Sequence, residues 1–181
     1  RKADAPGVSI DWQAGDMRAF DLDRRYRLIL LPANALCHLL TIADFEGCMR
    51  CVRRHLQPEG RFVIQVFVPD LRKLLEPPEE RRLFSEYDDP DGRGRIVVTE
   101  SATYDPATQI RYNRTYYRLP GQAEEEVGEL PMRMYFPQEL DALLRYNGFA
   151  IEAKYGGLDR RPFTSDSPMQ LYILALQPPQ P

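Results

Sequence analysis

Two short apolar runs near the start of the chain, each followed by a break, set the pattern for the rest. The first is residues 8–12 (VSIDW) and the second is residues 26–31 (YRLILL). The end of the second run lacks polar alternation, which is typical of a strand buried on both faces of a parallel sheet. In open parallel sheets, ligands lie at the carboxyl ends of the strands, where Asp16 and Asn34 follow these runs. The pattern therefore predicts that the segments after these two runs form the two sides of one ligand-binding cleft.

A helix is predicted directly after the second run. Thr41 and Asp44 have the form of an N-cap residue followed by an acid at the third helical position, so we expect a helix over residues 42–56. Its apolar residues recur at three- and four-residue spacing and predict one buried face. They are Phe45, Cys48, Met49, Val52 and Leu56.

Residues 57–60 (QPEG) are expected to stop this helix, because proline cannot continue it and glycine supplies a turn. Residues 61–68 (RFVIQVFV) then have the pattern of another buried strand. Strand, helix, turn and strand form a right-handed βαβ unit, so residues 26–31 and 61–68 are expected to be parallel neighbours.

The pattern changes after residue 68. Residues 69–84 predict one short charged helix, and three further runs separated by turn residues predict an antiparallel meander. These runs are residues 95–104, 109–119 and 124–135. Charged and aromatic residues mix within the meander, so neither of its faces is expected to be fully buried. We interpret residues 69–136 as an inserted antiparallel β subdomain that presents a surface.

The main pattern resumes at Pro137, which is favoured at the first position of a helix. Leu140, Leu143 and Leu144 form its apolar stripe, and residues 147–148 (NG) end it. Residues 150–155 and 169–176 are expected to be closing strands. The predicted fold class is therefore α/β, with one α/β domain over residues 1–68 and 137–177 and the insertion between its parts.

Composition and charge exclude several classes of partner. The net charge of −3 gives no basic surplus, so we expect no nucleic-acid partner. No apolar run approaches the ~18 residues that span a bilayer, and residues 1–15 lack the apolar segment of a signal peptide, so we expect no membrane partner. Three cysteines, an odd number, favour a reducing compartment over a disulfide framework, and we expect a cytoplasmic protein.

Cys48, Cys51 and His55 have the spacing of a metal site. On one helix they lie within about 60° of one another, and a single helix cannot close a tetrahedral shell. Cys48 also belongs to the apolar stripe. We therefore assign no metal to these residues and expect them to be structural.

Several segments together resemble a known family. Residues 15–18 (GDMR), 26–31 and 55–62 (HLQPEGRF), followed by the helix from residue 137 and the final strands, resemble the later motifs of class I S-adenosylmethionine (SAM)-dependent methyltransferases. Residues 155–167 resemble the small-molecule branch of that family. The resemblance implies a Rossmann-like sheet, SAM as the cofactor, and methyl transfer to a nitrogen or oxygen of a small-molecule acceptor.

The resemblance also implies roles for residues in the cofactor site. The Asp16 carboxylate would accept from the adenine amino group, and the Met17 backbone N–H would face a ring nitrogen. The alternative for this pair is a simple turn cap. Pro32, Ala33 and Asn34 would let the backbone approach the rest of the cofactor. Those five residues are the expected cofactor-binding set.

His38 is the expected catalytic residue, because it would face the transferred methyl group and would act as a base for an acceptor that arrives protonated. Its alternative is a surface histidine that precedes a helix. Tyr116, Arg133 and Tyr135 are the expected acceptor-binding residues. The insertion would then be a substrate lid or a homodimer contact.

Two features of the family have no counterpart in the sequence. The glycine-rich turn and the ribose-binding acid of the family are absent, because the chain begins at what resembles the third strand. We expect residues upstream of Arg1 to supply them. Two other functions stay open, namely a non-catalytic methyltransferase-like module that binds a protein through the insertion, and a nucleotide-binding Rossmann-type domain of other chemistry.

Overall fold

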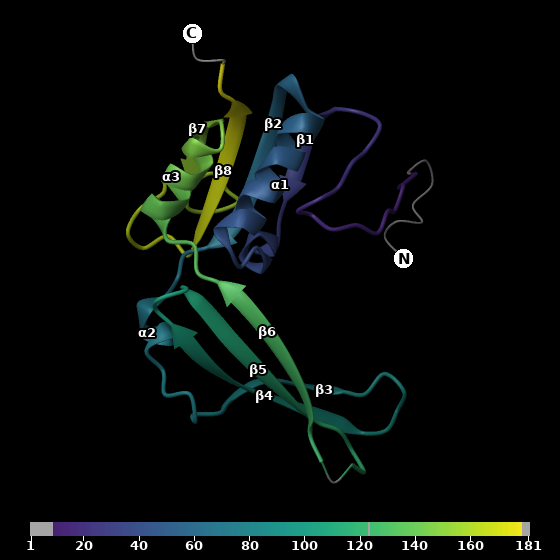
Figure 1. Ribbon diagram of the computed structural model, residues 1–181. Helices are drawn as coiled ribbons and strands as arrows, with labels where there is room; N and C mark the ends of the chain where they lie inside the picture. The colour runs from purple at the N-terminus through teal and green to yellow at the C-terminus, as the bar shows by residue number, and fades with distance from the viewer. Residues whose placement is uncertain (1–8, 123, 179–181) are drawn as a thin grey trace.

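The structure is a computed structural model that describes residues 9–122 and 124–178. Within this part of the chain, two four-stranded sheets form, one of order β1-β2-β8-β7 and one of order β3-β4-β5-β6 (Figure 1). The elements in chain order are β1 (Tyr26–Leu31), the 3₁₀ helix η1 (Ala35–His38), α1 (Ile42–His55), β2 (Leu56–Phe67), α2 (Leu71–Leu74), β3 (Arg82–Asp88), β4 (Arg95–Asp105), β5 (Ile110–Arg118), β6 (Glu126–Arg133), α3 (Pro137–Tyr146), β7 (Phe149–Tyr155) and β8 (Met169–Leu176).

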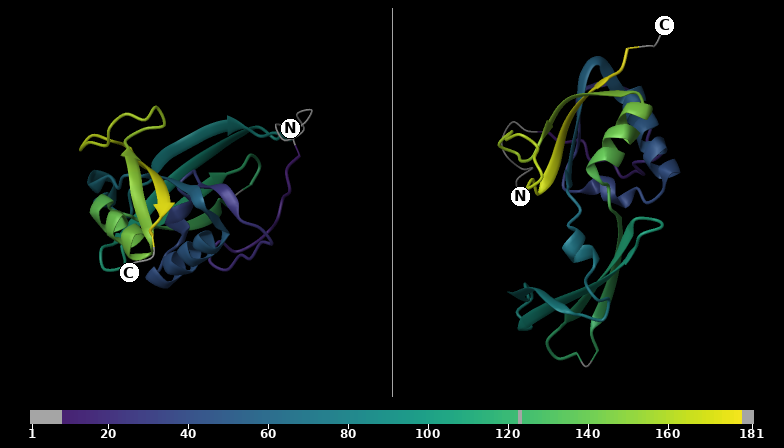
Figure 2. Two further views of the ribbon diagram at one scale, coloured as in Figure 1. Left: turned by 90° about the horizontal axis from the view of Figure 1, so that it is seen from above. Right: turned by 90° about the vertical axis from the view of Figure 1, so that its left-hand side faces the viewer.

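The first sheet is mixed and carries the α/β part of the fold. β1 and β2 are parallel, as the βαβ pattern predicts, whereas β8 is antiparallel to both β2 and β7. Helices α1 and α3 lie side by side on one face of this sheet (Figure 2). The core fills the layer between them, and its largest fully buried members include Phe45, Met49, Phe62, Leu140 and Phe149. The α/β prediction is confirmed.

Local signals explain both helices. Thr41 and Asp44 form a reciprocal capping box, with the Asp44 N–H donating to Thr41 Oγ1 at 3.0 Å and the Thr41 N–H donating to Asp44 Oδ2 at 3.1 Å. All five apolar residues of the predicted face are buried. Pro137 occupies the first turn of α3, where its missing N–H leaves no intrahelical bond unmade.

Two sequence predictions about the start of the mixed sheet are wrong. Within the described residues, 9–12 form no strand, and Ile10 and Trp12 are exposed; Val8 lies outside the described residues. A strand needs a neighbouring backbone to satisfy its N–H and C=O groups, and no described segment pairs with this one. For the same reason β1 is not buried on both faces: β2 is its one partner in the described sheet, and Leu28 and Leu30 are 53% and 58% exposed.

Residues 57–60 also differ from the prediction. The helix ends at His55, one residue before the predicted limit, and residues 57–60 continue into β2 as its irregular beginning instead of forming a turn. The ladder pairs Tyr26 with Leu56 and Leu28 with Arg61, so the extra residues of β2 bulge between the two pairs. Gly60 permits this because a Cβ there would lie 3.0 Å from the Tyr26 carbonyl oxygen.

The second sheet contains the three predicted runs and one strand more. β4, β5 and β6 form the expected antiparallel meander, and β3 adds to the edge of β4. The short helix expected after residue 68 is α2. This sheet extends away from the mixed sheet, and the chain enters it after β2 and returns between β6 and α3 (Figures 1 and 2). No helix in the described ranges has the length and apolar character to cross a membrane.

Candidate functional site

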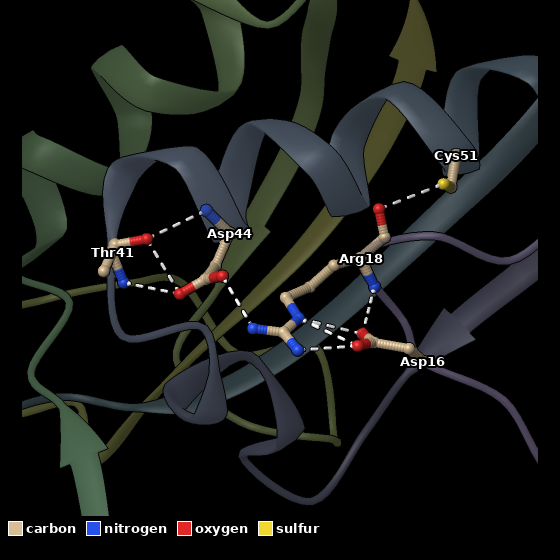
Figure 3. Close-up of polar contacts among 5 residues, drawn as sticks. All are labelled: Asp16, Arg18, Thr41, Asp44 and Cys51. Atoms are coloured by element: carbon tan, nitrogen blue, oxygen red, sulfur yellow. Dashed lines mark hydrogen bonds and ion pairs between the residues drawn. The ribbon is translucent and has the colours of Figure 1, made fainter.

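The loop after residue 14 is tied to the start of α1 by one arginine (Figure 3). The Arg18 guanidinium donates to both Asp16 oxygens, with Nη2 2.7 Å from Oδ2 and Nε 3.0 Å from Oδ1, and its Nη1 donates to Asp44 Oδ1 at 2.9 Å. The Arg18 backbone N–H also donates to Asp16 Oδ1 at 2.8 Å, and its carbonyl accepts from Cys51 Sγ at 3.5 Å. Arg18 therefore fixes the loop through its backbone and its side chain.

This contact sets the charge of the Asp16 carboxyl. Hydrogen bonds from the Arg18 side chain, and then from its backbone, lower the pKa of Asp16 to about 2. Because the pKa is lower in the folded state, the pair favours folding above the usual carboxyl range, and this contribution is lost as the pH falls through about 2. Asp16 therefore stays a hydrogen-bond acceptor at neutral pH.

Asp16 and Met17 line a surface cavity of about 450 Å³ formed by residues between Gln13 and Leu22. The Met17 backbone N–H has no hydrogen-bond partner among the residues that the structure describes, while the Met17 side chain packs against the core. A carboxylate offers about four acceptor positions, and Arg18 makes four hydrogen bonds to Asp16, so a ligand donor would share an Asp16 oxygen with Arg18. The turn-cap role predicted for Asp16 is present here, and it is compatible with a ligand role.

The turn after β1 holds its backbone in an unusual conformation. Ala33 and Asn34 have φ angles of 55° and 61°, in the left-handed region that residues with a Cβ rarely adopt. Hydrogen bonds to β2 hold them there: the Ala33 N–H donates to Gln65 Oε1 at 2.7 Å, and Asn34 Oδ1 accepts from the Phe67 N–H at 2.9 Å. Such strain persists where the surroundings enforce it, and it is concentrated at functional sites.

His38 is the last residue of η1, which follows this turn directly. Its side chain is exposed, while Leu36 and Cys37 beside it are fully buried. The 3₁₀ helix packs against β2 and β6. His38 is therefore held at the carboxyl end of the parallel pair with its ring accessible.

A second cavity, of about 370 Å³, opens at the carboxyl end of β2. It is lined from one side by Phe67 and Val68 and from the other by the second sheet and α2. The lining residues that the second sheet and α2 contribute include Arg111, Asn113, Met132, Lys73 and Leu74. Phe67 contacts both this cavity and Asn34, so the cavity adjoins the strained turn.

The three expected acceptor-binding residues lie in different surroundings. Tyr116 lines a separate hollow on the second sheet, where the Arg81 guanidinium lies 3.3 Å from its ring centroid. Arg133 is buried and donates to Glu139 Oε1 at 2.6 Å. Tyr135 is fully buried, and its hydroxyl donates to the Leu39 carbonyl at 2.6 Å. The structure brings Arg133 and Tyr135 together, with the Arg133 guanidinium carbon 5.0 Å from the centroid of the Tyr135 ring, whereas Tyr116 lies apart from both.

Arg111 and Asn113 line the cavity at the end of β2 and were not among the site residues predicted from the sequence. Both lie on one face of β5, since successive side chains of a strand alternate between faces. The Asn113 amide oxygen accepts from Arg111 Nη1, and its Nδ2 donates to the Leu130 carbonyl at 2.9 Å. The alternation was readable in the sequence, but the packing of α2 over this face was not.

The Cys48, Cys51 and His55 group has structural contacts. His55 is buried, with Nδ1 2.7 Å from the Cys51 carbonyl and Nε2 accepting from the Leu22 N–H at 2.8 Å. Nε2 also lies 3.1 Å from the Leu22 carbonyl oxygen and 3.3 Å from Asp21 Oδ1, and these contacts join the loop to α1. Burial raises the pKa of Cys48 to about 12, so its thiol stays protonated. In residues 9–122 and 124–178, no group of three or more metal-ligating side chains could hold an ion.

The fold is that of class I methyltransferases. The structure of the CcbJ methyltransferase from Streptomyces caelestis has a TM-score of 0.76 and 22% identity over 91% of this chain and 62% of its own. A SAM-dependent methyltransferase from Clostridium acetobutylicum gives 0.73 and 14%, over 95% and 67%. CalS10, an amino pentose methyltransferase from Micromonospora echinaspora solved with SAM, gives 0.66 and 19%, over 96% and 66%.

The likeness is therefore one of fold, and the resemblance drawn from the sequence motifs is confirmed at that level. The chain spans about 62% of the length of the CcbJ structure. No family model and no curated protein sequence matches the chain.

Proposed function

We propose that this protein transfers a methyl group from SAM to a nitrogen or oxygen of a small molecule. The observation that carries the proposal is a cavity beside a strained turn at the carboxyl ends of β1 and β2, in a chain with the fold of methyltransferases. Ligands of open α/β sheets bind at this edge. The similar structures include a sugar N-methyltransferase and a glycopeptide N-methyltransferase, which favours a small-molecule acceptor.

The residues at this edge fit the cofactor. Asp16 offers a charged acceptor and Met17 a free backbone donor, as an adenine ring requires. Pro32, Ala33 and Asn34 would hold the remainder of the cofactor beside the turn. When bound, SAM supplies an electrophilic methyl group. The protein contributes mainly position, because holding reactants in line removes most of the entropic barrier.

In the proposed reaction, His38 is the general base. Its imidazole is exposed at the end of η1 and would take a proton from the acceptor heteroatom. The cavity lined by Phe67 and Met132 would hold the body of the acceptor. Tyr135 would support this edge without contacting the acceptor, because its side chain has no exposed surface.

Calorimetric titration of the protein with SAM tests the cofactor site. Asp16→Ala should weaken binding about 5- to 150-fold because the adenine amino group loses its acceptor, and Asp16→Asn, which keeps an oxygen, should weaken it less. Asp23→Ala, a change of an exposed carboxylate in the same segment, is the matched control and should bind normally. His38→Ala should keep SAM affinity and lower kcat by about 100-fold.

The proposal fails if the full protein, including any residues that precede Arg1, does not bind SAM. An unchanged dissociation constant for Asp16→Ala would return that residue to its turn-cap role alone. Unchanged kcat for His38→Ala would show that the acceptor arrives deprotonated or uses another base.

A homodimer through the insertion is the second part of the proposal. β3 is an edge strand, and Leu83 and Phe84 on it are 62% and 65% exposed. An exposed apolar edge favours pairing with another chain. This surface also supports the alternative function, a non-catalytic module that binds a protein partner. Binding of SAM together with methyl transfer would exclude that alternative.

A further inference from the structure

The cavity at the end of β2 has an unbalanced charge. Its lining contains two cationic side chains, Arg111 and Lys73, and one carboxylate, Asp70. That carboxylate caps α2: Asp70 Oδ1 accepts from the Arg72 backbone N–H at 3.0 Å and lies 3.6 Å from Arg72 Nε. The lining therefore has a formal charge of about +1, and its acidic group is already engaged.

Arg111 lacks a close ion pair. Its side chain is 18% exposed, and its Nη2 lies 3.9 Å from Glu76 Oε2. The other oxygen of Glu76 accepts from Arg82 Nη1 at 2.6 Å, so this carboxylate is shared. Arg111 Nε has no hydrogen-bond partner among the described residues. Because a largely buried guanidinium is costly without a paired anion, the site favours a negatively charged ligand.

The rest of the lining gives the ligand its shape. Asn113 positions the Arg111 guanidinium, because its amide oxygen accepts from Arg111 Nη1 while its Nδ2 donates to the Leu130 carbonyl. Phe67, Met132 and other apolar residues form most of the remaining wall. A volume of about 370 Å³ lies within the range of small-molecule sites. The cavity therefore combines one fixed cation with an apolar enclosure.

We infer that this cavity recognises a monoanionic carboxylate on an apolar or aromatic acceptor, with Arg111 as the residue that pairs with the carboxylate. The inference rests on the proposed function, since it names the class of acceptor. A ligand with a single negative charge would neutralise the formal charge of about +1 on the lining, whereas a phosphate dianion would leave an excess negative charge in the cavity. Lys73, which makes no ion pair within the described residues, adds long-range attraction from the exposed surface of α2.

Two probes of nearly equal shape test this inference, N-acetylphenylalanine and its amide, titrated calorimetrically into the full protein without SAM. The acid should bind at least about 10-fold more tightly than the amide. Arg111→Gln should reduce this preference to less than about twofold. Arg114→Gln removes a cation from an exposed position of β5, where Arg114 pairs with Glu129 at 2.8 Å, and should leave the preference intact.

Equal binding of acid and amide, or binding of neither, overturns the inference, as does a preference that survives in Arg111→Gln. If circular dichroism shows that Arg111→Gln is unfolded, Lys73→Gln decides instead. It alters an exposed side chain and should lower affinity for the acid about threefold, with affinity for the amide unchanged; an unchanged affinity for the acid overturns the inference. SAM titration is independent of these probes, so a failure here is distinguishable from failure of the proposed function.

Discussion

The Tyr135 hydroxyl makes its hydrogen bond from a side chain with no exposed surface. Burial raises the pKa of this hydroxyl, so it stays neutral and donates to the Leu39 carbonyl. Tyr135→Phe should therefore lower the free energy of unfolding by about 1–2 kcal/mol, because the carbonyl is left without its donor. SAM affinity and acceptor KM should stay close to those of the unaltered protein.

Urea unfolding and steady-state kinetics measure both sides of this prediction. Leu39 is buried next to η1, so a loss of stability without a change in KM would establish Tyr135 as a structural support. A KM raised more than about fivefold at unchanged stability would instead make Tyr135 a contact of the acceptor.

At the scale of elements, the turn between β1 and η1 joins the two parallel strands at their carboxyl ends. Asn34→Ala removes the acceptor of the Phe67 N–H and keeps a Cβ at a φ of 61°, so it should lower the free energy of unfolding by about 1–3 kcal/mol. Asn34→Gly loses the same hydrogen bond but tolerates the backbone, so its cost should be smaller by roughly 1 kcal/mol. Equal losses in urea unfolding would show that the left-handed backbone contributes no strain.

Helices and strands whose ends are determined by adjacent residues could be predicted from the sequence. Thr41 with Asp44 and the position of Pro137 mark the helix starts locally, and both helices begin there. β3 could not be predicted, because RLFSEYD has charged and exposed residues and becomes a strand through pairing with β4. The same distinction between local and distant signals applies to the site. Ala33 and Asn34 could be predicted because they directly follow a strand, whereas the cavity around Arg111 forms only when two segments distant in the sequence pack together.

At the scale of the whole molecule, the second sheet offers an aromatic surface beyond the site. Replacing Tyr112, Tyr116 and Tyr117 together with serine should raise acceptor KM or shift the oligomeric state, because an isolated sheet of this kind needs a partner for its aromatic residues. SAM affinity should change little, since Asp16 and Met17 belong to the other part of the molecule. Sizing chromatography and acceptor kinetics that both stay unchanged would leave this surface without a role.

The antiparallel pairing of β2 with β8 sets the order in which the strands can pair while the chain is being synthesised. Phe62 pairs with Leu174, so roughly a hundred residues must leave the ribosome before β2 gains this partner, which takes roughly 5–20 s at ~5–20 residues per second. The hairpins of β4, β5 and β6 need far less chain and can close first. Their closure brings the distant ends nearer and lowers the entropic cost of the late pairing. During that interval β2 is an open strand edge, and the nascent chain is then at its most vulnerable to aggregation.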